Sequence, residues 1–219
     1  MYGMQITNDS GVVSLDSEFA RLSVLQSGRY VASSNTITIP LSPVVSTQEP
    51  PLIFVRPDNN NGVVVVGCSI AGSPGNWTSI TITGPVNYAP TGSYFIGGFV
   101  ASPSSGYGAR IWDSTGKLIF DTGTTAAVFT RFFQNWTYET STTDAQGYYI
   151  NWYSSPLNYS NGDYLMINNC YMKMVSGDNV GRVCGIRYDF SASKLWFTTT
   201  ALSNPIAFKL PAFFAKIVA

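Results

Sequence analysis

Histidine is absent from this sequence, and charged side chains are scarce. Of the 219 residues, 12 are Lys or Arg and 12 are Asp or Glu, so the formal net charge is zero and only 11% of the chain is charged. Without histidine there is no Ser-His-Asp or Cys-His relay, no HExxH zinc site and no imidazole that titrates near neutral pH. A neutral chain with no basic run also argues against a nucleic-acid partner, because Lys and Arg are needed to neutralise phosphates.

Long hydrophobic runs and paired cysteines are missing as well. The densest aliphatic run, Val63 to Val66, falls far short of the roughly 18 apolar residues that a membrane span requires. The first residues carry neither a basic nor an apolar segment, so we expect no signal peptide, synthesis in a cytoplasm and no membrane insertion. Cys68, Cys170 and Cys184 form no C-x-x-C pair, so we expect buried free thiols, no metal and no cofactor. A disulfide between Cys170 and Cys184 is the alternative.

Aromatic residues are abundant, and turn-forming residues interrupt them often. The 13 Tyr, 13 Phe and 5 Trp suit the pleated, half-buried surface of a β-sheet, while 20 Gly and 12 Pro leave little room for long helices. Short strand-like segments follow one another along the chain, separated by turns rich in Gly, Pro and Asn, as is typical of an antiparallel sandwich. We therefore predict an all-β fold, an antiparallel β-sandwich of the jelly-roll or immunoglobulin-like type, with little helix.

A stretch of Ser, Pro and Gly at 102–106 interrupts the strand pattern and is the best candidate for a domain boundary. A chain of this length can form one large all-β domain or two small ones. We predict two tandem or duplicated sandwich units, 1–105 and 106–219. The alternative is one continuous domain with a short linker inside it.

A segment near the start of the chain recurs further along. Residues 2–17 align without gaps on residues 107–122, at a constant offset of 105. The identical pairs are Tyr2/Tyr107, Gly3/Gly108, Ile6/Ile111, Gly11/Gly116 and Asp16/Asp121. In each copy an alternating apolar pattern is broken by a turn of Asn or Asp, Ser or Thr, and Gly, and then resumes, which predicts a β-hairpin.

Acidic residues in the repeat have two interpretations. The carboxylates of Asp16 and Asp121 close the returning strands, where they can accept backbone N–H bonds. The more specific alternative is a catalytic role for the carboxylates of Asp113 and Asp121. Acidic residues are common in turns, however, and no further catalytic group accompanies these two. A weaker echo of the repeat, Gly185 to Phe197, has Ser193 in place of the turn glycine and predicts another hairpin.

Ten aromatic residues lie in the 33 positions from Phe132 to Tyr164. One interpretation assigns alternate residues to the core of a strand-rich region. The other is a contact surface, since Tyr and Trp offer flat apolar faces and hydrogen bonds to a protein or a sugar ring. The candidate contact residues are Trp136, Tyr138, Tyr149, Trp152, Tyr153 and Tyr159.

The two copies of the repeat resemble a signature of small bacteriophage tail proteins, YG-x-x-[IV]-x-[ND]-x-x-G-x-[LV]-x-[FL]-D-[ST]. In that group the signature often stands near the N-terminus and again further along. The resemblance covers 32 of the 219 residues. It implies a structural tail or tail-tip component that works by assembly, and it carries over no catalytic residues.

Two functions are consistent with these observations. The first is a non-enzymatic structural component of a virion tail, in the distal tail, baseplate or fibre-attachment region, made in the bacterial host cytoplasm. Its partners would be other tail proteins and copies of itself, and low charge with many aromatics suits such interfaces. The second is a receptor- or carbohydrate-binding module of a virion that uses the segment 132–164 to contact a host surface receptor. A glycan hydrolase would need two carboxylates roughly 5 to 10 Å apart, and no spacing in the sequence selects such a pair.

Overall fold

The computed structural model describes residues 5–7, 9, 13–16, 20–60, 62–85, 87–101, 103, 106, 108–157, 162–168, 173–175, 181–202 and 210–218. Across these residues the chain has no helix and is built from antiparallel strands, which confirms the predicted all-β class. The strands are β1 (Gln5–Thr7), β2 (Val13–Asp16), β3 (Ser23–Val31), β4 (Thr36–Val45), β5 (Leu52–Pro57), β6 (Val63–Val65), β7 (Gly67–Ser73), β8 (Asn76–Thr83), β9 (Thr91–Gly98), β10 (Arg110–Trp112), β11 (Leu118–Asp121), β12 (Ala126–Phe133), β13 (Thr137–Thr143), β14 (Tyr149–Pro156), β15 (Tyr164–Met166), β16 (Lys173–Val175), β17 (Gly181–Asp189), β18 (Lys194–Ala201) and β19 (Ala212–Val218).

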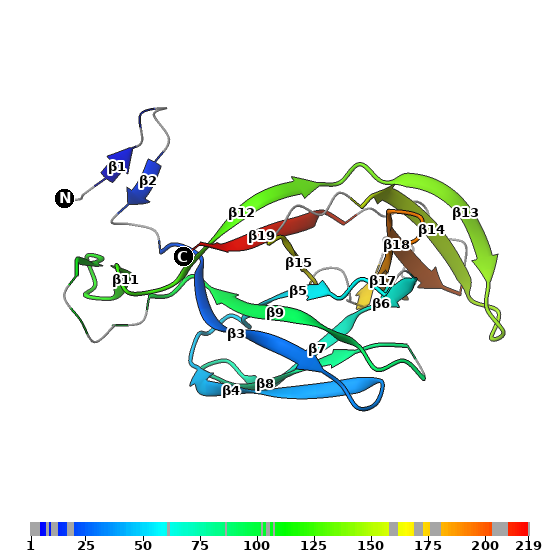
Figure 1. Ribbon diagram of the computed structural model, residues 1–219, viewed down its shortest axis with the longest axis horizontal. Helices are drawn as coiled ribbons and strands as arrows, with labels where there is room; N and C mark the ends of the chain where they lie inside the picture. Colours follow the sequence, from blue (N-terminus) through cyan, green and yellow to red (C-terminus); the bar gives the residue numbers. More distant parts are fainter. Residues whose placement is uncertain are drawn as a thin grey trace.

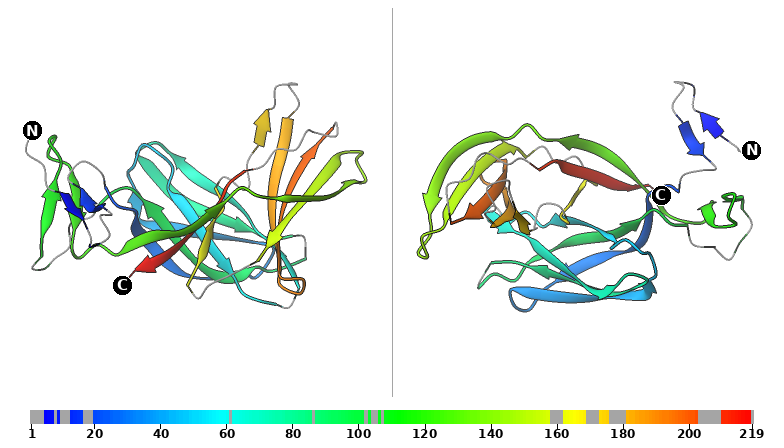
Figure 2. Two further views of the ribbon diagram at one scale, coloured as in Figure 1. Left: turned by 90° about the horizontal axis from the view of Figure 1, so that it is seen from above. Right: turned by 180° about the vertical axis from the view of Figure 1, so that it is seen from behind.

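Six strands form a closed barrel in the order β12-β19-β15-β5-β9-β3. Three of them precede residue 105 and three follow it, and β15 is hydrogen-bonded to β5 across that point. One barrel therefore contains strands from both predicted units, 1–105 and 106–219. Two further sheets flank the barrel: β4-β8-β7 on one side, and β13-β14-β18-β17-β16, with β6 beside β17, at one end (Figures 1 and 2).

The core has two parts, because side chains of a strand alternate between its faces. A small cluster inside the barrel receives residues from all six barrel strands: Val24, Leu52, Phe54, Phe95, Ala127, Tyr164, Met166, Ala215 and Ile217, joined by Leu22. At its centre the fully buried rings of Phe54 and Phe95 stack with centroids 4.3 Å apart. The opposite faces of β5 and β9, with Ile53 and Ile96, join a larger cluster that includes residues of the flanking sheets.

The repeated segments fold as two separate hairpins outside the barrel, both at the same end of the molecule (Figures 1 and 2). Their registers are identical at the offset of 105, including one irregularity: Gln5↔Asp16, Ile6↔Leu15 and Thr7↔Val13 match Arg110↔Asp121, Ile111↔Phe120 and Trp112↔Leu118. The predicted pair of hairpins is thus confirmed. Tyr2, Gly3, Gly11 and Tyr107 lie outside the described residues.

In the second hairpin the motif residues stabilise the hairpin itself. The Asp113 carboxylate accepts hydrogen bonds from the Thr115 hydroxyl (2.7 Å) and the Lys117 N–H (3.0 Å). These bonds hold the pKa of Asp113 below its usual range, and the bond from the Thr115 hydroxyl has the largest effect. Gly116 takes φ 85°, a left-handed conformation that glycine adopts readily. Asp121 is buried and accepts hydrogen bonds from Arg110 Nε (2.6 Å) and the Gly123 N–H (2.7 Å).

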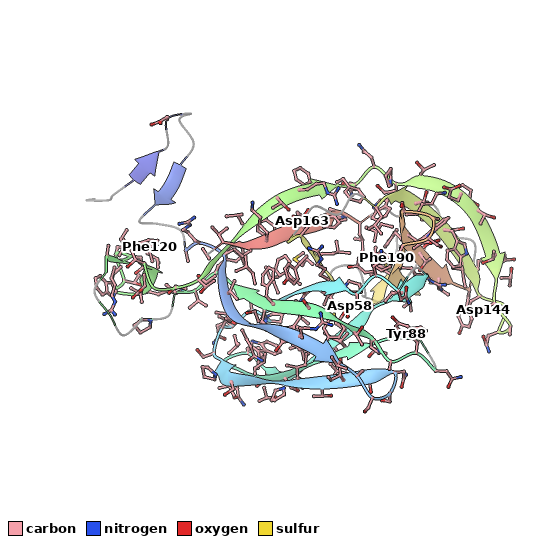
Figure 3. The ribbon with its side chains drawn as sticks, viewed as in Figure 1. Asp58, Tyr88, Phe120, Asp144, Asp163 and Phe190 are labelled. Atoms are coloured by element: carbon pink, nitrogen blue, oxygen red, sulfur yellow. The ribbon has the colours of Figure 1, made fainter. Side chains whose placement is uncertain are left out.

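Two other hairpins repeat this local chemistry. Between β13 and β14, the Asp144 carboxylate accepts bonds from the Gln146 and Tyr148 N–H groups (3.0 and 2.9 Å), and Gly147 has φ 83°. Figure 3 shows Asp144 at the tip of this hairpin, opposite the end that carries Phe120. The hairpin predicted from the weaker echo is confirmed as β17–β18, in which Ser193 takes φ 51° at the position of the missing glycine.

Gly108→Ala should loosen the β10–β11 hairpin without unfolding the barrel. A methyl group at Gly108 would lie 2.0 Å from Thr122 Oγ1, displacing a hydroxyl that accepts a hydrogen bond from the Ala109 N–H (3.2 Å). Loss of one such bond costs about 0.5–1.5 kcal/mol. Hydrogen exchange should rise across 109–122 with an unchanged melting temperature, whereas Gly106→Ala, where the methyl meets nothing within 4 Å, serves as the control. Equal exchange in both variants would refute the close-approach explanation.

Both described cysteines have free thiols, as predicted, but Cys68 is only partly buried, whereas Cys184 is buried. Cys68 in β7 carries a free thiol, and burial raises its pKa to about 12. Cys184 in β17 is buried in the larger core cluster. Cys170, and with it the alternative disulfide, lies outside the described residues.

Candidate contact surfaces

The six aromatic residues singled out in the segment 132–164 have different environments. Trp136 and Tyr153 are 3% and 1% exposed and belong to the core, so their assignment as contact residues is corrected. Tyr153 lies on the face of β14 that packs inward, and the Trp136 Nε1–H donates a hydrogen bond to the Leu210 C=O (2.7 Å). Tyr138 and Tyr149 are exposed, Trp152 is half-buried, and Tyr159 lies outside the described residues.

An outer-face cluster forms around Trp152 on the side of the β14–β18–β17 sheet that faces away from the core. We define it as Trp152, Arg187, Lys194 and Trp196. The two indoles are nearly perpendicular, with centroids 6.1 Å apart. The Arg187 guanidinium lies 4.4 Å from the centre of the Trp152 ring, and Lys194 Nζ lies 4.9 Å from that of Trp196. The register Arg187↔Trp196 creates this cluster, and no sequence spacing around Trp152 indicated Trp196.

The two cations of the outer-face cluster are compensated differently. Lys194 Nζ pairs with Glu139 Oε1 at 3.0 Å. The pKa of Glu139 is lowered, mainly by the hydrogen bond from the Ser154 hydroxyl and next by that from Lys194. In the described part of the chain no carboxylate pairs with Arg187, and burial lowers the pKa of its guanidinium. A guanidinium held against an indole retains donors that can bind an anionic group.

The barrel is closed between β12 and β3 only at the start of the two strands. Within the described residues the ladder joining them is one pair, Ala126↔Ser23, whereas β3 and β9 share eight pairs. Beyond that pair the two strands diverge (Figure 1). The inner side of β12 is therefore accessible beyond the buried Ala127.

Aromatic side chains occupy this accessible side. We call Phe129, Phe132 and Phe213 the open-side strip. Phe132 is 73% exposed and stacks on Phe213, with ring centroids 6.2 Å apart. Phe129 is 47% exposed and meets Phe213 edge-on, with ring centroids 6.1 Å apart. Phe129 also lies 6.1 Å from the buried ring of Phe54, so the strip is continuous with the barrel interior.

A bulge makes the strip possible. Residues 129 and 132 are three positions apart and would lie on opposite faces of a regular strand. The β12–β19 ladder shifts between Phe129 and Arg131, so that Phe129 pairs with Ala215 and Phe132 with Phe213. Because Phe213 and Ala215 share one face of β19, the two Phe side chains of β12 share that face as well.

A polar pocket of about 510 Å³ lies at one end of the barrel interior, where Arg56 and Ser93 continue the faces of β5 and β9 that carry Phe54 and Phe95. Figure 3 shows the position of Asp58, another of its lining residues. The Arg29 guanidinium binds both Asp58 carboxylate oxygens, at 3.1 and 2.6 Å, and holds the pKa of Asp58 below its usual range. The charge of Asp58 is thus already balanced within the pocket.

Among the described residues, no three Cys, Asp or Glu side chains are grouped so that they could hold a metal ion. The described segments include no helix with the length and apolar character needed to cross a membrane. Comparison with protein-family models, curated proteins and solved structures found no match.

Proposed function

We propose that this protein is a non-enzymatic structural subunit of a bacteriophage tail, in the distal tail, baseplate or fibre-attachment region. It would act through contacts with other tail proteins and with copies of itself. The repeated hairpin that resembles a tail-protein signature supports the proposal, because both copies fold as self-contained units at one end of the molecule.

The open-side strip is the observation that carries the proposal. Contiguous exposed apolar side chains mark protein–protein contact sites, and aromatic residues are enriched at the centres of such contacts. Here Phe132 stacks on Phe213, Phe129 meets the same ring edge-on, and both remain exposed. A partner that covers the strip would bury this area without having to desolvate a charge, since Arg131 is turned to the other face and lies 4.1 Å from the Phe214 ring.

Phe132→Ser should weaken assembly while leaving the monomer folded. Burying one Phe side chain contributes about 1.5–3 kcal/mol, so association should fall by about tenfold or more. Light scattering after size exclusion measures self-association, and immunodetection of purified particles measures incorporation. Leu202→Ser is the matched control, since Leu202 is similarly exposed (67%) but lies away from the strip, directly after β18. A wild-type protein that stays monomeric and is absent from particles would contradict the proposal, as would equal assembly of both variants.

Receptor or carbohydrate binding is a second candidate function, which the outer-face cluster favours. Trp152 and Trp196, with an Arg187 guanidinium that pairs with no carboxylate of the described residues, suit a sugar that carries a carboxylate. Arg187→Gln should lower affinity for an acidic oligosaccharide such as oligogalacturonate by about tenfold or more, as expected for a charge-assisted pair. Titration calorimetry would measure it, with Lys117→Gln in the β10–β11 turn as the charge-matched control. Equal binding of a neutral oligosaccharide, or no effect of Arg187→Gln, would exclude this role.

A further inference from the structure

Beyond Ala127, the backbone edge of β12 that faces β3 has no ladder partner among the described residues. The Ala127 N–H donates to the Leu22 C=O at 2.9 Å, so it points toward the β3 side, away from β19. Ala127, Phe129 and Phe132 pair with Ile217, Ala215 and Phe213, which are alternate residues of β19. Hydrogen-bonded and non-hydrogen-bonded pairs alternate along an antiparallel ladder, so the pairs at alternate residues of β19 are of one type. The bulge takes up the extra residue of β12, and the Phe129 and Phe132 N–H groups therefore point to the β3 side, as that of Ala127 does. In the described part of the chain no ladder reaches them there.

A second edge strand, β13, carries features that prevent its exposed edge from pairing with another chain. β13 pairs only with β14 among the described strands, and its side chains are mostly polar. It carries a bulge between Tyr138 and Thr140, and the Glu139 carboxylate lies in that bulge. Bulges and charges are devices that prevent an edge from pairing with another chain. The edge of β12 also has a bulge, but it aligns two aromatic rings and turns the Arg131 charge to the other face.

We propose that the edge of β12 accepts an extended strand from a neighbouring subunit, which adds to the sheet in the gap between β12 and β3. The incoming strand would place apolar side chains at alternate positions on the open-side strip. This inference rests on the proposed function, since it states how the assembly surface engages its partner. A strand satisfies both features at once, because its backbone supplies the missing ladder bonds and its alternating side chains cover the rings. A helix or loop docked on the rings would leave the edge unpaired.

Hydrogen exchange on the full-length protein tests the inference. The Phe129 and Phe132 amides should exchange rapidly in the monomer and become protected in the assembled state. Val128, whose N–H points toward β19, should be protected in both states and serves as the internal reference. If the strip is buried in the assembly but these two amides stay unprotected, the inference is overturned while the proposed function stands. If the wild-type chain does not assemble, or if Phe132→Ser assembles normally, the proposed function itself fails.

A pair of variants separates the backbone contribution from that of the ring. Phe129→Ser and Phe129→Pro both remove the phenyl group, but only proline removes the N–H, and proline is tolerated where an edge N–H faces solvent. We expect Phe129→Pro to associate more weakly than Phe129→Ser, by about 2- to 10-fold for one lost backbone bond. Thermal melts of the monomers would establish that both fold. Equal association of two folded variants would overturn strand addition.

Discussion

Trp136→Ala should lower the free energy of unfolding by about 3–5 kcal/mol, the usual cost of removing a large aromatic side chain from a core. The Trp136 indole is 3% exposed, and its ring lies 5.0 Å from that of Phe133 and 5.5 Å from that of Phe197. Truncation would also leave the Leu210 C=O without the bond it accepts from Nε1–H. Chemical denaturation followed by fluorescence or circular dichroism measures the change.

Tyr138→Ala is the matched control for Trp136→Ala, because Tyr138 is two residues away in the chain and 53% exposed. Exposed positions of this kind change stability by about 0.5 kcal/mol or less. Similar losses in the two variants would contradict the assignment of Trp136 to the core. The distinction matters for function, since loss of binding or assembly in Trp136→Ala would report unfolding rather than a lost contact.

Phe54→Ala should be comparably damaging, at about 3–5 kcal/mol, because it empties the centre of the small cluster inside the barrel. Phe54 is fully buried, stacks on Phe95 and supports Phe129 from below. The thermal unfolding midpoint measures the loss. Phe132→Ser is the control here, since its ring is 73% exposed and the monomer should keep its stability. A Phe54→Ala protein as stable as the wild type would show that the barrel interior is not a core.

Loss of Phe54 should also affect assembly if the proposed function is correct. The open-side strip rests on this ring through Phe129, so a cavity below would let the strip sink or reorient. Assembly would then weaken even under conditions in which the variant remains folded. The rings that form the barrel core thus continue onto the surface proposed for contact.

Local chemistry determined what the sequence alone predicted correctly. The turn from Asp113 to Gly116, the paired hairpins and the Ser193 turn depend on bonds between residues a few positions apart, as in the contacts of Asp113 with Thr115 and Lys117. Alternating apolar residues and frequent Gly and Pro likewise set the all-β class, because both act on the backbone close to where they stand. These features do not depend on which strand becomes the neighbour.

Only the tertiary structure decided which strands pair and which side chains are covered. The barrel joins β5 to β15 and β3 to β12 over long stretches of sequence, and no local pattern encodes such partners. Trp136 is buried while Tyr138 is exposed, and Trp196 meets Trp152, because of packing and register between distant segments. The open-side strip exists because one bulge in β12 rotates Phe132 onto the face of Phe129. Burial and ladder pairing are non-local, so a sequence pattern shows that aromatic residues are present and the fold determines which of them a partner can reach.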